Sequence, residues 1–150
     1  MVVVGADVAT TGARDDLVAF VEAIGGAVLV NMDARGVFPE SHPRWAGVMT
    51  GNYTANTVED EIGQLCDLAI LVGAESMMTH APWGFEMPAV ELVSRPEYRT
   101  TSPNPEVRVD GSLGETLRTL TSVAGAGVPI ESIDAAKHNI LKYFERSPET

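Results

Sequence analysis

Short, unbroken runs of apolar residues alternate along this chain with longer stretches in which apolar residues recur at helical spacing. Five segments are predicted to be strands: residues 2–4, 27–30 and 68–72 are unbroken apolar runs, whereas residues 88–93 and 107–110 include charged residues. A strand without polar alternation is typical of a parallel sheet, which is covered on both faces. We therefore expect an α/β fold of three layers, in which a mostly parallel sheet of five to six strands carries helices on both faces.

Capping signals indicate where the helices begin. Thr11 precedes an acidic turn and is expected to cap the first helix. Thr57 with Asp60 approximates a capping box, and Ser112 with Glu115 matches one fully. A last helix is expected over residues 131–147. The residues expected to face the core from these helices are Leu17, Phe20, Val21, Ile24, Val58, Ile62, Leu65, Leu113, Leu117, Leu120, Ile133, Ile140, Leu141 and Phe144.

Three segments show neither the helical nor the strand periodicity of apolar residues. Glycines and prolines punctuate residues 33–53, which favours a loop, and residues 94–105 carry three prolines and predict another. Residues 75–87 are aperiodic but contain Met77, Met78, Trp83, Phe85 and Met87. Adaptable methionine and aromatic surfaces suit a partner interface, and they suit equally a loop folded over the core. The pattern favours neither interpretation.

Composition narrows the class of protein. A chain of 150 residues fits a single domain, here residues 1–150. The formal net charge of -11 argues against nucleic acid or an anionic membrane surface as a partner, since both require a basic face. The single cysteine, Cys66, permits no intrachain disulfide, fits a cytoplasmic protein, and is expected to be a small buried side chain. No apolar run reaches the roughly 18 residues of a membrane span.

The stretch 35–75 carries a recognisable pattern. It contains the block Gly36-x-Phe38-Pro39-Glu40-x-His42-Pro43, then a Gly47-x-x-x-Gly51 pair, then a helix and a strand that ends in Gly73-Ala74. This arrangement resembles the central domain of thiamine-diphosphate-dependent enzymes, the family of acetolactate synthase, pyruvate decarboxylase and benzoylformate decarboxylase. The resemblance covers roughly residues 2–124, and the block around His42 is its most specific part.

The resemblance implies a six-stranded Rossmann-like fold of the type shared with sirtuins and transhydrogenase. It also implies a parent enzyme of three domains that acts on 2-keto acids. In that family the other two domains activate thiamine diphosphate and bind its diphosphate and Mg²⁺ through a Gly-Asp-Gly motif. Here Asp110-Gly111 lacks the preceding glycine. The abrupt apolar start suggests a central domain excised from a longer chain, with neighbouring catalytic domains as partners and a homo-oligomeric parent.

The carboxyl ends of the predicted strands are the candidate ligand site. In doubly wound sheets, ligands bind outside these ends, where the strand order reverses. The residues at these positions are Gly5, Ala6, Asp7, Gly73, Ala74, Glu75, Ser94 and Asp110. The resemblance implies FAD in this crevice for some relatives, ADP in others and no nucleotide in the rest.

The chain departs from the nucleotide-binding pattern at this crevice. Flavin-binding relatives carry a basic residue where Glu75 stands, and an acidic residue where this chain has Ser94-Arg95. A carboxylate facing a diphosphate is unfavourable unless a cation lies between them. We therefore expect a vestigial crevice in preference to a functional nucleotide site.

Other candidate ligands have weaker support. Asp33, Glu40 and His42 could be imagined as a metal trio, but no ligand spacing supports this, and His42 belongs to a proline-flanked turn. His80 and His138 lack a carboxylate pattern and are expected at the surface or in caps. No residue is assigned a catalytic or metal-binding role.

Three hypotheses remain. The first is a structural central domain of a thiamine-diphosphate enzyme, which is not catalytic alone. The second is an independent nucleotide-binding module for FAD, ADP or NAD. The third is a non-enzymatic scaffold or interaction domain.

Overall fold

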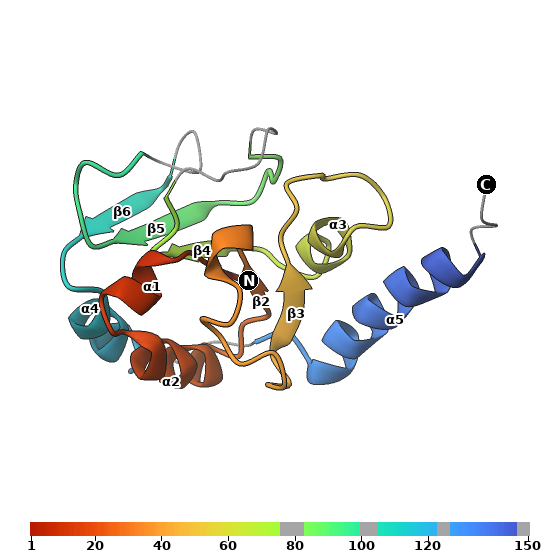
Figure 1. The fold of residues 1–150 in the computed structure, drawn as a ribbon, viewed down its shortest axis with the longest axis horizontal. Helices are drawn as coiled ribbons and strands as arrows, with labels where there is room; N and C mark the ends of the chain where they lie inside the picture. The colour runs from red at the N-terminus through yellow and green to blue at the C-terminus, as the bar shows by residue number, and fades with distance from the viewer. Residues whose placement is uncertain (76–82, 100–104, 123–126, 147–150) are drawn as a thin grey trace.

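A six-stranded, fully parallel sheet forms the centre of the molecule (Figure 1). The structure is a computed structural model that describes residues 1–75, 83–99, 105–122 and 127–146. The strand order is β3-β2-β1-β4-β5-β6. The strands are β1 (Val2–Val4), β2 (Val28–Val30), β3 (Trp45–Val48), β4 (Ala69–Val72), β5 (Ala89–Val93) and β6 (Val107–Asp110). The predicted α/β class with a parallel sheet is confirmed.

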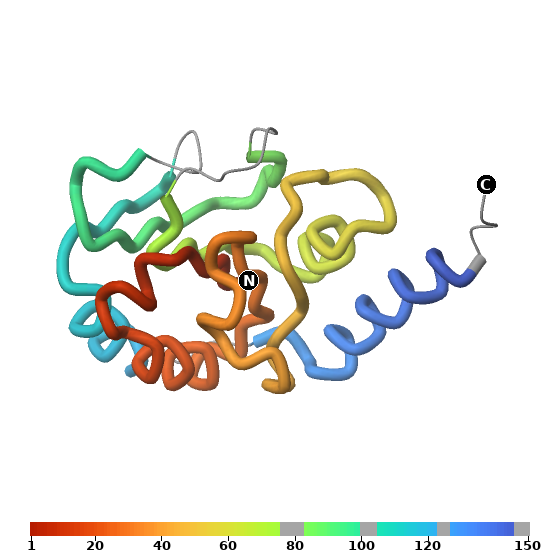
Figure 2. The backbone as a smooth tube through the Cα atoms, viewed as in Figure 1, coloured from red at the N-terminus to blue at the C-terminus, as the bar shows by residue number. Residues whose placement is uncertain are grey.

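Helices cover both faces of this sheet. They are α1 (Asp7–Thr10), α2 (Arg14–Ile24), the short 3₁₀ helix η1 (Met32–Ala34), α3 (Val58–Gly63), α4 (Leu113–Leu120) and α5 (Ile130–Arg146). Helix α2 packs beside α4, whereas α3 packs beside α5. The backbone tube shows these two pairs in separate regions of the molecule (Figure 2).

Two hydrophobic cores lie on opposite faces of the sheet. Along β1, Val2 and Val4 belong to the core that contains Leu17 and Phe20 of α2, whereas Val3 belongs to the core that contains Ile62 of α3. This alternation follows from the two-residue period of a strand. Since all three valines are fully buried, β1 is covered on both faces, as its unbroken apolar run predicts.

The strand order reverses between β1 and β4. From β1 the chain proceeds outward through β2 to β3, and then returns to the other side of β1 for β4, β5 and β6. Val4 pairs in register with Val30 on one side and with Val72 on the other. The segments that follow β1 and β4 therefore emerge next to each other at the carboxyl edge of the sheet.

Strand β3 corrects the prediction that residues 33–53 form only a loop. Trp45, Gly47 and Val48 pair with β2, with a register shift between Val28 and Leu29. Gly47 adopts φ 153° within it. An edge strand tolerates such irregularity because only one of its sides is paired. The strand was not predicted because it is short and contains a glycine, and it therefore lacks the continuous apolar run by which strands were identified.

The capping predictions divide into two groups. The side chains of Thr57 and Ser112 accept hydrogen bonds from the backbone N–H groups of Asp60 and Glu115, as predicted. The prediction for Thr11 is wrong, because its hydroxyl donates 2.7 Å to the carbonyl of Asp7 and therefore closes α1. The sequence pattern did not predict α1.

Some predicted core residues lie at the surface. Leu65, Leu141 and Phe144 are 42%, 60% and 67% exposed, so their assignment to the core is wrong. Cys66 is half-buried instead of fully buried. Among the described residues, no helix is both long and apolar enough to cross a membrane.

The described part of the segment 75–87 folds over the core that contains Val3 and Ile62, here called the second core. Trp83, Phe85 and Met87 pack against it. The ring centroid of Phe85 lies 4.9 Å from that of Tyr53 and 5.0 Å from that of Trp83. For these residues the interpretation as a loop over the core holds, whereas Met77, Met78 and His80 lie outside the described residues.

Candidate functional site

Backbone packs against backbone where the strand order reverses. The N–H of Gly5 donates 2.9 Å to the carbonyl of Val72, and the N–H of Asp7 donates 3.3 Å to that of Gly73. A Cβ at Gly5 would lie 2.1 Å from the carbonyl oxygen of Gly73 and 2.4 Å from the Cα of Ala74. The close approach that Gly5 permits is therefore to the chain itself.

Asp7 is the central side chain of this edge. It lies in the first turn of α1 and is only 7% exposed. Its carboxylate accepts hydrogen bonds from the hydroxyl of Thr10 at 2.9 Å, the backbone N–H of Ser94 at 3.3 Å and the hydroxyl of Tyr98 at 3.4 Å. A buried carboxylate with these donors joins the end of β1 to the segment that follows β5.

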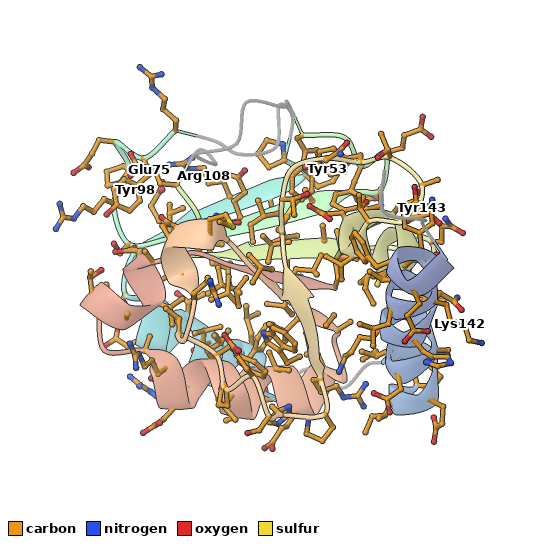
Figure 3. The ribbon with its side chains drawn as sticks, turned by 45° about the vertical axis from the view of Figure 1, so that its right-hand side comes forward. Tyr53, Glu75, Tyr98, Arg108, Lys142 and Tyr143 are labelled. Carbon is orange, nitrogen blue, oxygen red and sulfur yellow. The ribbon has the colours of Figure 1, made fainter. Side chains whose placement is uncertain are left out.

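Tyr98 is a site residue that the sequence did not indicate. It lies in a polar loop without a period, and only the folded chain places it beside Asp7. Desolvation raises the pKa of the Tyr98 phenol, and the negative charges of Asp7 and Glu75 raise it further, although Arg95 opposes them. The phenol stays protonated and donates to Asp7. Figure 3 shows Tyr98 and Glu75 at the same end of the molecule.

Arg108 fastens this loop to the edge of the sheet. Its guanidinium donates to the carbonyl of Tyr98 at 2.6 Å and to that of Pro96 at 3.2 Å. It also pairs with Glu91 at 3.4 Å and with Asp110 at 3.2 Å. Glu91 is 1% exposed in the middle of β5, so the guanidinium places a positive charge beside a buried carboxylate. Asp110, predicted as a ligand-binding residue, is bound to Arg108.

A third buried carboxylate, besides those of Asp7 and Glu91, lies beyond the end of β3. Glu59 in the first turn of α3 is fully buried. Its Oε1 accepts hydrogen bonds from the backbone N–H groups of Thr50 and Gly51, the latter at 2.7 Å. Two carboxylates of the chain, Asp7 and Glu59, thus bind backbone N–H groups beyond the ends of β5 and β3. These backbone N–H groups are therefore already bound by carboxylates of the chain itself.

Tyr53 lies near Glu59, and its ring packs on Phe85. Desolvation raises the pKa of the Tyr53 phenol to about 12, and the charge of Glu59 contributes in the same direction, whereas the backbone of Gly84 opposes them. The phenol is therefore neutral throughout the physiological range.

His42 has a structural environment. Its Nδ1 accepts a hydrogen bond from the backbone N–H of Arg44 at 3.1 Å, and its Nε2 lies 3.3 Å from a carboxylate oxygen of Glu22. Its ring stacks edge-on against Phe38 with 5.0 Å between centroids. Within residues 1–75, 83–99, 105–122 and 127–146, no three His, Cys, Asp or Glu side chains gather to hold a metal ion. His138 is exposed on α5.

Two cavities lie away from the predicted site residues. One of about 510 Å³ is lined by residues that include Met1, Gly26, Cys66 and Val128. The other, of about 400 Å³, is lined by residues that include Tyr53, Gly63, Phe85 and Glu86. None of the eight residues predicted at the strand ends lines either cavity.

Comparison with known proteins gives one family. A family model described as "Thiamine pyrophosphate enzyme, central domain" matches residues 1–120. A pyruvate decarboxylase of Neurospora crassa is 32% identical over 74 residues, which cover 49% of this chain and 13% of that protein.

Solved structures agree with this result. A protein assigned to the thiamin diphosphate-dependent enzymes of Mycobacterium smegmatis superposes with a TM-score of 0.67 at 27% identity, covering 85% of this chain and 25% of its own. Benzoylformate decarboxylase of Polynucleobacter necessarius superposes with a TM-score of 0.68 at 21% identity, covering 83% and 24%. At that identity the second match shows the fold alone. The chain spans a quarter or less of the length of each of these relatives.

Proposed function

This chain belongs to the family of thiamine pyrophosphate enzyme central domains, and from that premise we propose that it is the structural central domain of a longer enzyme. That enzyme would decarboxylate 2-keto acids or ligate the products, using thiamine diphosphate and Mg²⁺. The support is the family match over residues 1–120 together with the 32% identity to a pyruvate decarboxylase over 74 residues. In this proposal the chain is not catalytic alone.

The residues of this chain do not fit thiamine diphosphate or its metal ion. Its single Asp-Gly pair is Asp110-Gly111, and the carboxylate of Asp110 lies 3.2 Å from the guanidinium of Arg108. A carboxylate neutralised by arginine is a poor ligand for Mg²⁺, which prefers free carboxylate and water oxygens. The proposal therefore assigns the cofactor and the metal ion to other domains of the parent enzyme.

The observation that favours a structural role is that carboxylates of the chain itself bind backbone N–H groups at the carboxyl edge of the sheet. Asp7 and Glu59 bind backbone N–H groups of Ser94, Thr50 and Gly51. A nucleotide diphosphate would compete with these carboxylates and be repelled by them. A nucleotide role for FAD, ADP or NAD is therefore disfavoured, and so is an independent nucleotide-binding module.

Further elements of the proposal concern the surroundings of the domain. Its partners would be the neighbouring catalytic domains of the same polypeptide, and the parent would be a homo-oligomer in the cytoplasm. A non-enzymatic scaffold is the remaining alternative, since the same fold could persist without an enzyme around it.

The test is an assay of the longer polypeptide for release of CO₂ from pyruvate and benzoylformate, with and without thiamine diphosphate and Mg²⁺. We expect release that depends on the cofactor, and none from residues 1–150 alone. A gene product that carries this segment but shows neither cofactor binding nor turnover of any 2-keto acid would support the scaffold alternative.

A further inference from the structure

Helix α5 packs against the described body of the molecule over its first half. Ile133 and Ala136 are buried in the second core, and the amide of Asn139 donates 3.4 Å to Glu61 of α3. Lys137 lies 5.8 Å above the ring of Trp45 in β3. Beyond these contacts the helix continues away from the sheet, and its C-terminal end is the part farthest from it (Figure 1).

The apolar face of α5 continues past the packed half. Residues 133, 137, 140 and 144 follow one another at spacings of three and four, so Phe144 lies on the same side of the helix as the buried Ile133. Phe144 is 67% exposed, and Leu141, one turn before it, is 60% exposed. Tyr143, whose ring centroid lies 5.8 Å from that of Phe144, is 47% exposed. Three large side chains therefore extend the buried face into solvent, and we call Leu141, Tyr143 and Phe144 the α5 tip.

The apolar area of the α5 tip indicates what kind of partner covers it. Three large side chains that are half to two-thirds exposed present on the order of 400 Å² of surface, well under the roughly 800 Å² per partner that a stable independent complex buries. A contact this small holds when its partner is attached to the same chain, because a linker supplies an effective concentration in the millimolar range. The area therefore favours a covalently linked partner over a second copy of this chain.

The comparisons agree with a linked partner. The family model ends at residue 120, so α5 lies beyond the part that it matches. The similar solved chains extend well beyond the matched part, since this chain covers only 25% and 24% of them. In a polypeptide of that length, further domains are available to contact a helix that overhangs the sheet.

The charges of α5 do not favour an acidic or a basic partner surface. Lys137 pairs with Asp134 at 3.6 Å in the packed half of the helix. In the exposed half, the positive charge of Lys142 is accompanied by the negative charge of Glu145, and both residues are exposed (Figure 3 labels Lys142). The partner surface is therefore expected to be apolar.

We propose that the α5 tip docks on an apolar surface of another domain of the same polypeptide. This inference rests on the proposed function, because it requires the longer chain. It assigns α5 as the element through which the central domain is held in a fixed orientation to a neighbour.

The test is hydrogen–deuterium exchange of the longer polypeptide and of residues 1–150 alone. Residues 138–146 should exchange on the order of tenfold more slowly in the longer polypeptide, because docking adds protection to a helix end that otherwise frays. The double substitution Leu141→Glu and Phe144→Glu should abolish this difference. The matched control is Met32→Glu, which changes a side chain that is 57% exposed elsewhere on the surface, and it should leave the difference unchanged.

The possible outcomes separate the hypotheses. Equal exchange of residues 138–146 in the two proteins would overturn the docking proposal, and thiamine diphosphate binding by the same longer polypeptide would show that the proposed function stands. A longer polypeptide that does not bind the cofactor would contradict the proposed function instead. If residues 1–150 alone form a dimer in sedimentation that Phe144→Glu dissociates, the occupant is a second copy and the docking proposal is overturned.

Discussion

The carboxylate of Asp7 accepts a hydrogen bond from the backbone N–H of Ser94 at 3.3 Å, although 87 positions separate the two residues in the chain. The contact joins the segment after β1 to the segment after β5, across the intervening strand β4. It fixes the position of the loop that carries Tyr98, whose hydroxyl also donates to Asp7. A single side chain thus holds together the connections that follow β1 and β5 at the carboxyl edge.

Replacing Asp7 with alanine should lower the free energy of unfolding by about 2–3 kcal/mol, because a buried carboxylate is lost and its donors are left unpaired. The measurement is urea denaturation followed by circular dichroism. Asp33→Ala is the control, since Asp33 is exposed, and it should change stability by less than about 0.5 kcal/mol. Equal stability of the two variants would show that Asp7 does not hold the edge.

Two substitutions of different severity test the role of Glu59, the buried carboxylate beyond the end of β3. Glu59→Ala leaves the N–H groups of Thr50 and Gly51 without their acceptor and should cost about 3 kcal/mol. Glu59→Gln keeps a side-chain oxygen in place and should cost about 1 kcal/mol. Glu40→Ala, at an exposed position, serves as the control. If the glutamine variant were as unstable as the alanine variant, the acceptor role would be wrong.

Gly5 is expected to tolerate no side chain. Its added Cβ would approach the backbone of Gly73 and Ala74 within 2.1–2.4 Å, so Gly5→Ala should cost about 3 kcal/mol or prevent folding. Gly12 is the control, because at φ 71° a Cβ added to it would meet nothing within 4 Å. Gly12→Ala should therefore cost only the backbone strain, about 1–2 kcal/mol. Comparable losses would contradict the close approach of β1 and β4.

The raised pKa of Tyr53 predicts a loss of folding stability at alkaline pH. The pKa of its phenol is about 12 in the folded chain and 10 when exposed, so between these values the unfolded chain releases a proton that the folded chain retains. The contribution of Tyr53 is present below pH 10 and disappears as the pH rises to 12. Over that interval Tyr53→Phe should lose less stability than the unaltered protein in denaturation curves measured at each pH. Parallel curves for the two proteins would show that the phenol is not desolvated.

Local patterns predicted most of the fold. The apolar runs at residues 2–4 and 68–72 and the caps at Thr57 and Ser112 depend on neighbouring residues only, and these predictions are confirmed by β1, β4 and the N-termini of α3 and α4. Strand β3 was missed because it is an irregular edge strand with a glycine inside it. Leu141 and Phe144 were assigned to the core because helical spacing identifies an apolar face, but it does not show how far the body beneath that face extends.

The candidate site was predictable in position but not in its contacts. The strand-end rule indicated Asp7, Ser94 and Asp110, which the structure places at the carboxyl edge of the sheet. The partners Tyr98 and Arg108 could not be identified, because each contact joins residues that only the folded chain brings together. A charged residue in a loop or an edge strand is more often simply exposed, so its type alone carries no signal.

The central claim is that this domain supports an enzyme whose cofactor is bound elsewhere in the polypeptide. Its most direct test is isothermal titration of thiamine diphosphate, in the presence of Mg²⁺, into the longer polypeptide and into residues 1–150 alone. The account predicts saturable binding to the longer polypeptide and no heat of binding to the isolated domain. Binding of the cofactor by residues 1–150 alone, or its failure to bind the longer polypeptide, would contradict the account.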